Sequence, residues 1–329
     1  MDSEIAAKTE RRIIDAATKQ SIKQFFNIDI DGEILSPTVD YVFKRIFTAD
    51  EHRSKIALID FLNSVLEFEN EKNITDLTVI NPNIPTDVLA RKKSIFDVRV
   101  AFNDGEQAII EMQVSDEHNF KKRSQFIVSK SYTSQDIAGL DYNALKKCYL
   151  IAVLNYNLLD GQETYVNDYR FRDRKGKDLT DDETIIFVEL PKIDRILDKP
   201  VAEMTNLEMW ILFFRYVTDK SKRDLLNTII NRNGGIEMAV GVLNEISSNA
   251  ETRIQYENEL IYELDVNSRL NYAKSQGISQ GISQGINQGI SQGKLGVAKN
   301  LLSMGFPLAD IMKATNLDEK EIEELKNQK

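Results

Sequence analysis

Residues 96–114, FDVRVAFNDGEQAIIEMQV, decide the fold. Apolar side chains occupy every second position in both halves, as in half-buried strands, and Asn103-Asp104-Gly105 between them is typical of a hairpin turn. Paired residues in a hairpin have numbers with a constant sum. A sum of 208, from a three-residue turn with Gly105 in the left-handed conformation, places both apolar rows on one face, whereas 209 separates them. We therefore expect the 208 register.

The other face of this hairpin gathers polar side chains. In the 208 register Asp97 lies across from Glu111, and Gln113 lies two residues further along. Cross-strand neighbours are ~4.5–5.5 Å apart at Cβ, so both carboxylates could bind one hard cation. Mg²⁺ in such a site lowers the pKa of bound water and neutralises phosphate charge, as phosphodiester hydrolysis requires. A solvated polar strand face is the alternative, and the spacing alone does not decide.

The flanking segments predict an α/β architecture. CYLIAVL, residues 148–154, is wholly apolar, which is typical of a strand covered on both faces. Ser36 is suited to cap a helix that begins at Pro37. The further expected elements are helices at 55–66 and 120–137 and strands at 76–80 and 184–190. This order predicts an α/β sandwich with a mixed sheet.

The hydrophobic period becomes helical from about residue 194 onward. We therefore expect a helical region after the α/β domain, followed by a glycine repeat. The expected parts are a helical N-terminal extension (1–33), the α/β domain (34–193), a helical subdomain (194–274), the repeat (275–296) and a C-terminal helical pair (297–329), with helices at 296–304 and 308–325.

The repeat has a period of four residues, with Gly at 277, 281, 285, 289 and 293 and Ile at 278, 282, 286 and 290. A helix could use the glycines for close approach and the isoleucines for burial, although each interior Gly costs ~1 kcal/mol against Ala. The rows turn by about 40° per unit, so a straight partner follows them only briefly. Helical self-association is the favoured interpretation, and a mobile tether is the alternative.

Composition excludes several classes of protein. The chain has 52 acidic and 42 basic residues, a net charge of −10, which disfavours coating nucleic acid through bulk charge. Two distant histidines and the single Cys148, in an apolar segment, argue against Cys/His zinc sites and a nucleophilic thiol. No apolar run approaches the ~18 residues of a membrane span. We expect a cytoplasmic protein with no membrane association and no small-molecule cofactor.

The stretch at 96–114, preceded by LSPTVDYVFKRIF (35–47) and followed by a helix and CYLIAVL, resembles the recombination-promoting nuclease family of transposase-like proteins, within the PD-(D/E)XK nuclease superfamily. The resemblance implies a restriction-endonuclease-like core with a mixed sheet and an all-helical C-terminal region. It also implies a Mg²⁺-dependent DNA endonuclease. Asp97 matches the motif aspartate and Glu111 the motif glutamate, while Gln113 stands where the superfamily has Lys, as it often does in this family.

The resemblance thus makes Asp97, Glu111 and Gln113 the catalytic residues. Asp40 is the third candidate metal ligand beside Asp97 and Glu111, although Asp40 and Lys44 at i, i+4 also suit a surface pair. Gln113 would orient water or phosphate, because an amide carries no charge. A displaced lysine is the alternative, with Lys44, Lys122 and Lys130 as candidates. The residues expected to contact DNA are Lys44, Lys92, Lys93, Lys122 and Arg123.

The expected function is low-specificity, salt-sensitive cleavage of DNA in recombination, mobile-element biology or phage defence. We identify no basic stretch interleaved with aromatic residues that would favour base stacking. The expected assembly is a homo-oligomer formed through the glycine repeat. The alternative is a catalytically inactive oligomeric protein that binds DNA or another partner.

Overall fold

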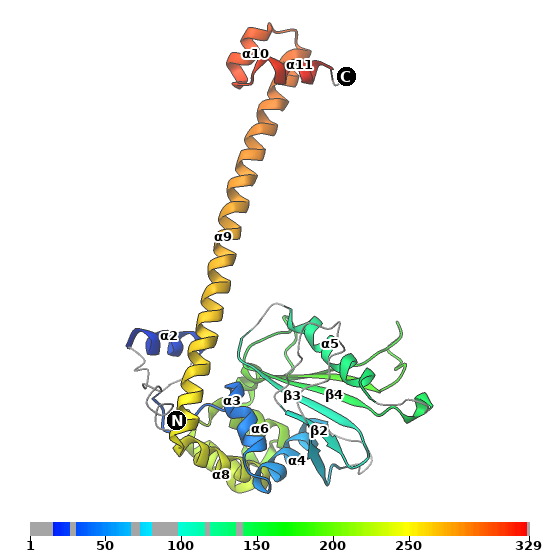
Figure 1. Cartoon of the computed structure of the whole chain (residues 1–329), viewed down its shortest axis with the longest axis vertical. Coiled ribbons are helices and arrows are strands. Elements are labelled where there is room, and N and C mark those ends of the chain that lie inside the picture. Colours follow the sequence, from blue (N-terminus) through cyan, green and yellow to red (C-terminus); the bar gives the residue numbers. More distant parts are fainter. Residues whose placement is uncertain are drawn as a thin grey trace, which may run out of the picture. The chain divides into compact units, whose positions relative to one another are not determined.

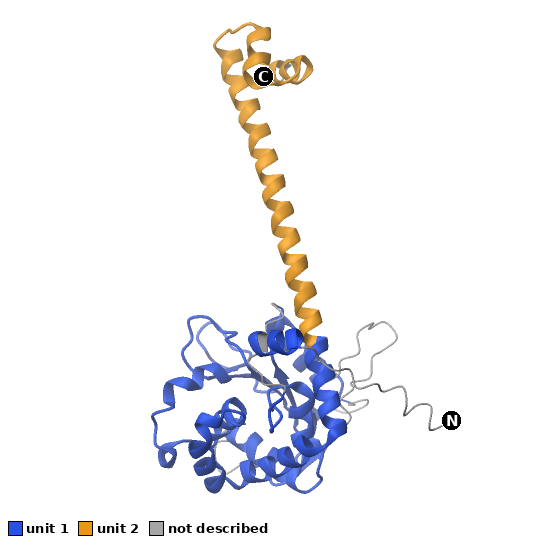
Figure 2. Ribbon diagram, turned by 90° about the vertical axis from the view of Figure 1, so that its left-hand side faces the viewer, with its two compact units in different colours: residues 1–262 blue, residues 263–329 orange. Residues whose placement is uncertain are grey.

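The computed structural model describes residues 16–26, 31–66, 73–80, 98–115, 119–135 and 141–327. These residues form two compact units, 1–262 and 263–329, which are coloured separately in Figure 2. The first unit holds the sheet and most of the helices. Each unit is described by itself below.

A six-stranded mixed sheet, ordered β1-β2-β3-β4-β6-β5, forms the centre of the first unit. β1, β2 and β3 are antiparallel, β3, β4 and β6 are parallel, and β5 runs antiparallel to β6 at the edge. The mixed sheet confirms the expected fold class. The strands are β1 (Leu77–Val79), β2 (Val98–Phe102), β3 (Gln107–Gln113), β4 (Cys148–Leu154), β5 (Val166–Tyr169) and β6 (Glu183–Glu189). The sequence did not predict β5, because its residues are half-exposed or exposed and do not alternate.

The β2–β3 hairpin has the predicted 208 register. Val98 pairs with Ile110, and Ala101 pairs with Gln107. The turn closes with a 2.8 Å hydrogen bond from the Phe102 amide to the Glu106 carbonyl. Gly105 has φ 87°, in the left-handed region that a side chain would strain. The turn chemistry therefore sets which side chains share a face of the sheet.

Helices cover both faces of the sheet (Figure 1). α5 (Phe120–Thr133) lies over β4 and β6, where Ile127 and Val128 pack with Ile109 and Leu150. α3, α4, α6 and α8 gather on the other side, and α3 packs against β2 and β3. All seven residues of β4 are buried, as the apolar sequence predicts for a strand covered on both faces.

An aromatic cluster holds the second helical layer together. Phe43, Phe47, Phe61, Trp210 and Phe214 have ring centroids 5.1–6.4 Å apart, in edge, tilted and stacked contacts. The helices of the first unit are α2 (Ala16–Phe26), α3 (Asp40–Thr48), α4 (Arg53–Leu66), α5, α6 (Asn206–Tyr216), α7 (Arg223–Arg232), α8 (Gly234–Ser248) and the start of α9 (Ala250–Ser303). Short 3-10 turns lie at Tyr142–Ala144, Leu190–Ile196, Val201–Glu203 and Lys220–Lys222.

The start of α3 differs from the prediction. The helix begins at Asp40 rather than at Pro37, and Ser36 does not cap it. The Ser36 hydroxyl instead lies 2.8 Å from that of Thr38 in the preceding turn. The carboxylate of Glu259, on α9, accepts a hydrogen bond from the Tyr41 amide at 3.2 Å. A cap supplied from 218 residues away is invisible to a local pattern.

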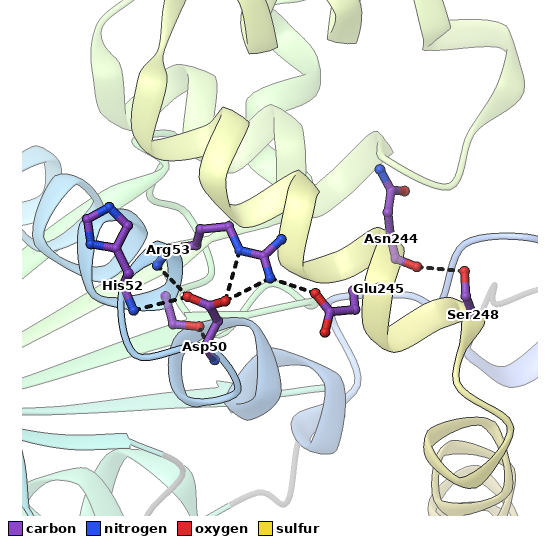
Figure 3. Close-up of polar contacts among 7 residues, drawn as sticks. Asp50, His52, Arg53, Asn244, Glu245 and Ser248 are labelled. Carbon is purple, nitrogen blue, oxygen red and sulfur yellow. Dashed lines mark hydrogen bonds and ion pairs between the residues drawn. The ribbon is translucent and has the colours of Figure 1, made fainter.

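The turn between α3 and α4 is joined to α8 by an ion-pair chain (Figure 3). Asp50 accepts hydrogen bonds from the amides of His52 and Arg53, and so caps the start of α4. The Arg53 guanidinium lies 2.7 Å from Asp50 and 2.6 Å from Glu245. The hydrogen bond from Arg53 lowers the pKa of Asp50. This partly exposed network orients the turn rather than supplying much stability.

The second unit consists of most of α9 and two short helices. α9 continues as one helix through the whole glycine repeat, and α10 (Leu308–Thr315) and α11 (Glu319–Asn327) follow it. The single helix expected at 308–325 is wrong, because Asn316 adopts the left-handed conformation with φ 58° and ends α10. Ala298, Ile311, Leu317 and Ile322 form a small core. None of the helices in the described part of the chain is long and apolar enough to cross a membrane.

Candidate active site

Glu111 is a buried carboxylate in the middle of the sheet. Its relative exposure is 1%, and its strand β3 continues in parallel pairing to β4 and β6. Glu111, Ala152 and Phe187 form one cross-strand row. That row lies on the face covered by α5, since Ala152 and Phe187 pack with Phe120 of that helix. The alternative of a solvated polar strand face is therefore wrong for Glu111.

Two polar side chains among the described residues contact Glu111. Gln113 Nε2 donates a hydrogen bond of 3.4 Å to Glu111 Oε2, and Arg123 Nη2 lies 3.5 Å from the same oxygen. Arg123 comes from the first turn of α5, where its guanidinium also lies 5.9 Å from the Phe120 ring centroid. A buried carboxylate is costly unless it is paired, and Arg123 supplies positive charge beside it.

Arg123 was expected to contact DNA, and the structure places it at the candidate catalytic carboxylate. The sequence signal is weak but readable. Glu111 lies near the end of β3 and α5 begins at Phe120, so a short return brings the first turn of the helix beside that strand end. The structure thus brings together Glu111, Gln113 and Arg123 from two adjacent elements.

Asp40 and Lys44 lie on α3, both half-buried. Asp40 Oδ1 is buried and accepts no hydrogen bond from any described residue. Lys122 lies on α5 with an exposed side chain, and Lys130 Nζ lies 5.7 Å from the Phe126 ring centroid. Asp97, Lys92 and Lys93 lie outside the described residues.

Cys148 is buried on the same face of the sheet, in the cluster with Ile109 and Leu150. Burial raises the pKa of its thiol to about 11. A thiol of this kind is protonated at neutral pH and is a poor nucleophile. This environment agrees with the packing role that its apolar sequence predicts.

The donor chemistry of the site fits a hard divalent cation in part. Glu111 and Gln113 offer carboxylate and amide oxygens on the face under α5, whereas Asp40 lies on α3, which packs on the other side of the sheet. Across the described ranges, no group of three or more His, Cys, Asp or Glu side chains could hold a metal ion.

Comparison with known proteins gives one match. The family model described as PD-(D/E)XK nuclease family transposase matches residues 37–273, well over half of the chain. It covers the sheet, α5 and the helical layer, and it confirms the resemblance seen in the sequence. No curated protein and no solved structure matches the chain.

Proposed function

Since the chain belongs to the PD-(D/E)XK nuclease family transposases, whose nucleases generally use divalent metal ions, we propose that it is a Mg²⁺-dependent DNA endonuclease with low sequence specificity. One observation carries the proposal. Glu111, at the position of the motif glutamate, is buried under α5 with Gln113 and Arg123 at its carboxylate. The enzyme would act on DNA in the cytoplasm, during recombination, mobile-element biology or phage defence.

The side chains of the site have different proposed roles. Glu111 and Asp97 would hold Mg²⁺, which when bound lowers the pKa of water and neutralises phosphate charge. The 208 register seen from Val98 to Ala101 is the one in which Asp97 is expected opposite Glu111. Gln113 would orient the attacking water or a phosphate oxygen through its amide. Arg123 keeps the Glu111 carboxylate in place and offers N–H groups to a phosphate oxygen.

A plasmid-nicking assay tests the proposal. Glu111→Gln keeps the shape of the side chain and removes its charge, so nicking with Mg²⁺ should fall roughly a hundredfold or more. Glu237→Gln, on the exposed side of α8, is the matched control and should nick as the wild type does. Nicking activity that survives Asp97→Ala combined with Glu111→Ala, or that EDTA does not abolish, would refute the proposed metal-dependent nuclease site.

The second candidate is a catalytically inactive DNA-binding or interaction protein. The amide of Gln113 at the usual lysine position favours it, because an amide cannot serve as a base at neutral pH. Calorimetric titration with Mg²⁺ separates the two candidates. An active enzyme should bind Mg²⁺ more tightly than Glu111→Gln does, whereas equal heats from both proteins would favour the inactive candidate.

The glycine repeat supports a proposal about assembly. Ile278, Ile282, Ile286 and Ile290 are 54–59% exposed, and a Cβ built at any repeat glycine meets nothing within 4 Å. The helix thus presents an apolar row beside a row that permits close backbone approach. We propose that two copies of this chain pair through it. Because period 4 exceeds 3.6, the pair should cross with a right-handed twist.

Sedimentation equilibrium tests this assembly. Ile282→Lys with Ile286→Lys should give a monomer at concentrations where the wild type forms a larger species. Gln284→Lys with Gln288→Lys adds the same charge two residues further along the helix, on another side of it, and should leave the mass unchanged. A wild-type monomer at all concentrations would refute the pairing.

A further inference from the structure

A cleft of about 520 Å³ is lined by residues of α5, β6 and the end of β5. The rings of Tyr169, Phe171 and Phe187 line it, with Tyr169 and Phe187 at a centroid distance of 5.7 Å. Lys121 and Gln125, one turn apart on α5, line the opposite wall. The volume is in the range of small-molecule and cofactor sites. Aromatic walls with a few polar groups suit a flat, polar-edged ring system.

The cleft and Glu111 lie on the same face of the sheet. Phe187 is two strands from Glu111 in one cross-strand row, and Tyr169 pairs with Ile185 in the next row. Phe171, two residues after Tyr169, lines the same cleft. At ~4.8 Å per strand, β6 lies roughly 10 Å from β3, and β5 lies roughly 14 Å from it. Asn167 pairs with Phe187 in the row of Glu111, and Phe171 lies four residues beyond Asn167, so its ring is further from Glu111 than the strand spacing alone gives.

Two of the three rings remain accessible, although the sheet beside them is buried. Tyr169 and Phe171 are 39% and 47% exposed, whereas Phe187 is 4% exposed. Solvent-facing rings at the end of an edge strand contribute little to the core. Phe171 therefore offers an aromatic surface that the fold itself does not require.

The segment that carries these rings is basic. From 168 to 178 there are five basic and three acidic residues, although the whole chain has a net charge of −10. Tyr169-Arg170-Phe171-Arg172 alternates aromatic and cationic side chains, so the expectation that no such stretch exists is wrong. Arg170, which lines the cleft, pairs with Asp168 and Asp178, and Arg172 pairs with Asp178. Phosphate groups of a polyanion could replace those exposed ion pairs.

We propose that this cleft binds an unpaired base of the DNA strand, stacked on Phe171 and Tyr169, while Lys121 and Arg170 contact the flanking phosphates. Gln125 and Asp160 offer hydrogen bonds to the base edge. The inference rests on the proposed nuclease function and refines its substrate. The preferred DNA has a single-stranded or unpaired segment several nucleotides from the cut, because the cleft and Glu111 lie on the same face of the sheet but on strands that are not neighbours.

Fluorescence anisotropy in EDTA tests the proposal without cleavage, so the result does not depend on nuclease activity. The full-length protein is titrated with a labelled 12-nucleotide single strand and with a paired duplex of the same sequence. Phe171→Ala should weaken binding of the single strand by about fivefold to a hundredfold, the range of base–aromatic stacking, and binding of the duplex less than twofold. Phe171→Tyr keeps the ring and should retain the affinity.

Phe126→Ala is the matched control. Phe126 is 60% exposed, lies on α5 and does not line the cleft, so its removal should change single-strand binding less than twofold. A strand that carries 5-iodouracil should crosslink to Tyr169 or Phe171 under light. Equal affinity of the wild type and Phe171→Ala, an equal loss in Phe126→Ala, or a crosslink elsewhere would overturn the proposal. A free deoxynucleotide that binds as tightly as the strand would show a small-molecule site instead.

Discussion

Strand β4 and the repeat segment of α9 are both lined with aliphatic side chains, yet all seven β4 residues are buried and the repeat isoleucines are more than half exposed. The strand has neighbours on both sides and helices on both faces. The repeat presents its isoleucines without cover from the described chain. Aliphatic content alone therefore does not locate a core. A β-strand cannot satisfy its backbone alone, whereas a helix can form first and find a partner later.

The largest expected difference between the two regions concerns burial. Leu150→Ala on β4 should lower the free energy of unfolding by about 2–5 kcal/mol, because it removes a fully buried side chain and leaves a cavity. Ile282→Ala in the repeat should change it by less than about 0.5 kcal/mol in a dilute sample. Urea unfolding followed by tryptophan fluorescence, which reports on Trp210 in the first unit, checks the first value. Circular dichroism at 222 nm checks the second. Equal losses of unfolding free energy in the two variants would contradict this difference in burial.

Glycine gives a second contrast, with a smaller expected effect. A Cβ at Gly235 would lie 2.3 Å from the Cβ of Asp60, whose carboxylate accepts hydrogen bonds from Trp210 and Asn233. Gly235→Ala should therefore destabilise the first unit by about 1–3 kcal/mol, despite the better helix propensity of Ala. Thermal unfolding measures it. Gly234→Ala is the neighbouring control, since a Cβ there meets nothing within 4 Å. An unchanged melting temperature for Gly235→Ala would show that α4 and α8 approach less closely.

Gly281→Ala should have the opposite sign. No atom lies within 4 Å of a Cβ at this position, so the substitution should stabilise the helix by about 1 kcal/mol. Hydrogen exchange of the repeat amides in dilute protein should slow about fivefold. At high protein concentration the same variant should self-associate less tightly than the wild type, because the added methyl group would keep two closely packed helices apart. Faster exchange in the dilute variant would contradict a solvent-exposed helix.

The smallest expected effect on stability at neutral pH concerns Cys148, whose thiol is buried beside Leu150. Since its thiol pKa is raised to about 11 from 9.0, the thiolate fraction at pH 8 falls from about one in ten to about one in a thousand. The folded state holds this proton more tightly than the unfolded chain, so stability should fall as pH rises from 9 towards 11. A thiol reagent at pH 8 should label native protein far more slowly than denatured protein. Rapid native labelling would mean that this face of β4 opens.

Much of the sheet could be predicted because its signals are local. The hairpin register followed from Gly105 and the two alternating rows, and the full burial of β4 followed from CYLIAVL. The missed features have different causes. The true start of α3 involves Glu259, which is 218 residues away, whereas α10 ends at the neighbouring Asn316 in its left-handed conformation. β5 lacks alternation because it lies at an edge.

In the candidate site, too, some features could be predicted from the sequence and others could not. Its residue types and the Glu111–Gln113 spacing were readable in the sequence, and both positions lie within the range of the family match. The contact of Arg123 with Glu111 was not predicted, since it requires the crossing of α5 over the sheet. The cleft was missed for a related reason. Tyr169 and Phe171 line the cleft only because β5 pairs with β6, which brings their rings to the same face of the sheet as Glu111.

The sequence by itself determined the hairpin register, the mixed α/β order and the period of the repeat, because turn geometry and side-chain alternation act over a few residues. The tertiary structure decided that Glu111 is buried against Arg123, that Gly235 must lack a side chain, and that an aromatic cleft lies two strands from the carboxylate. These features arise where segments distant in the chain pack together, and close packing is set by all of them at once.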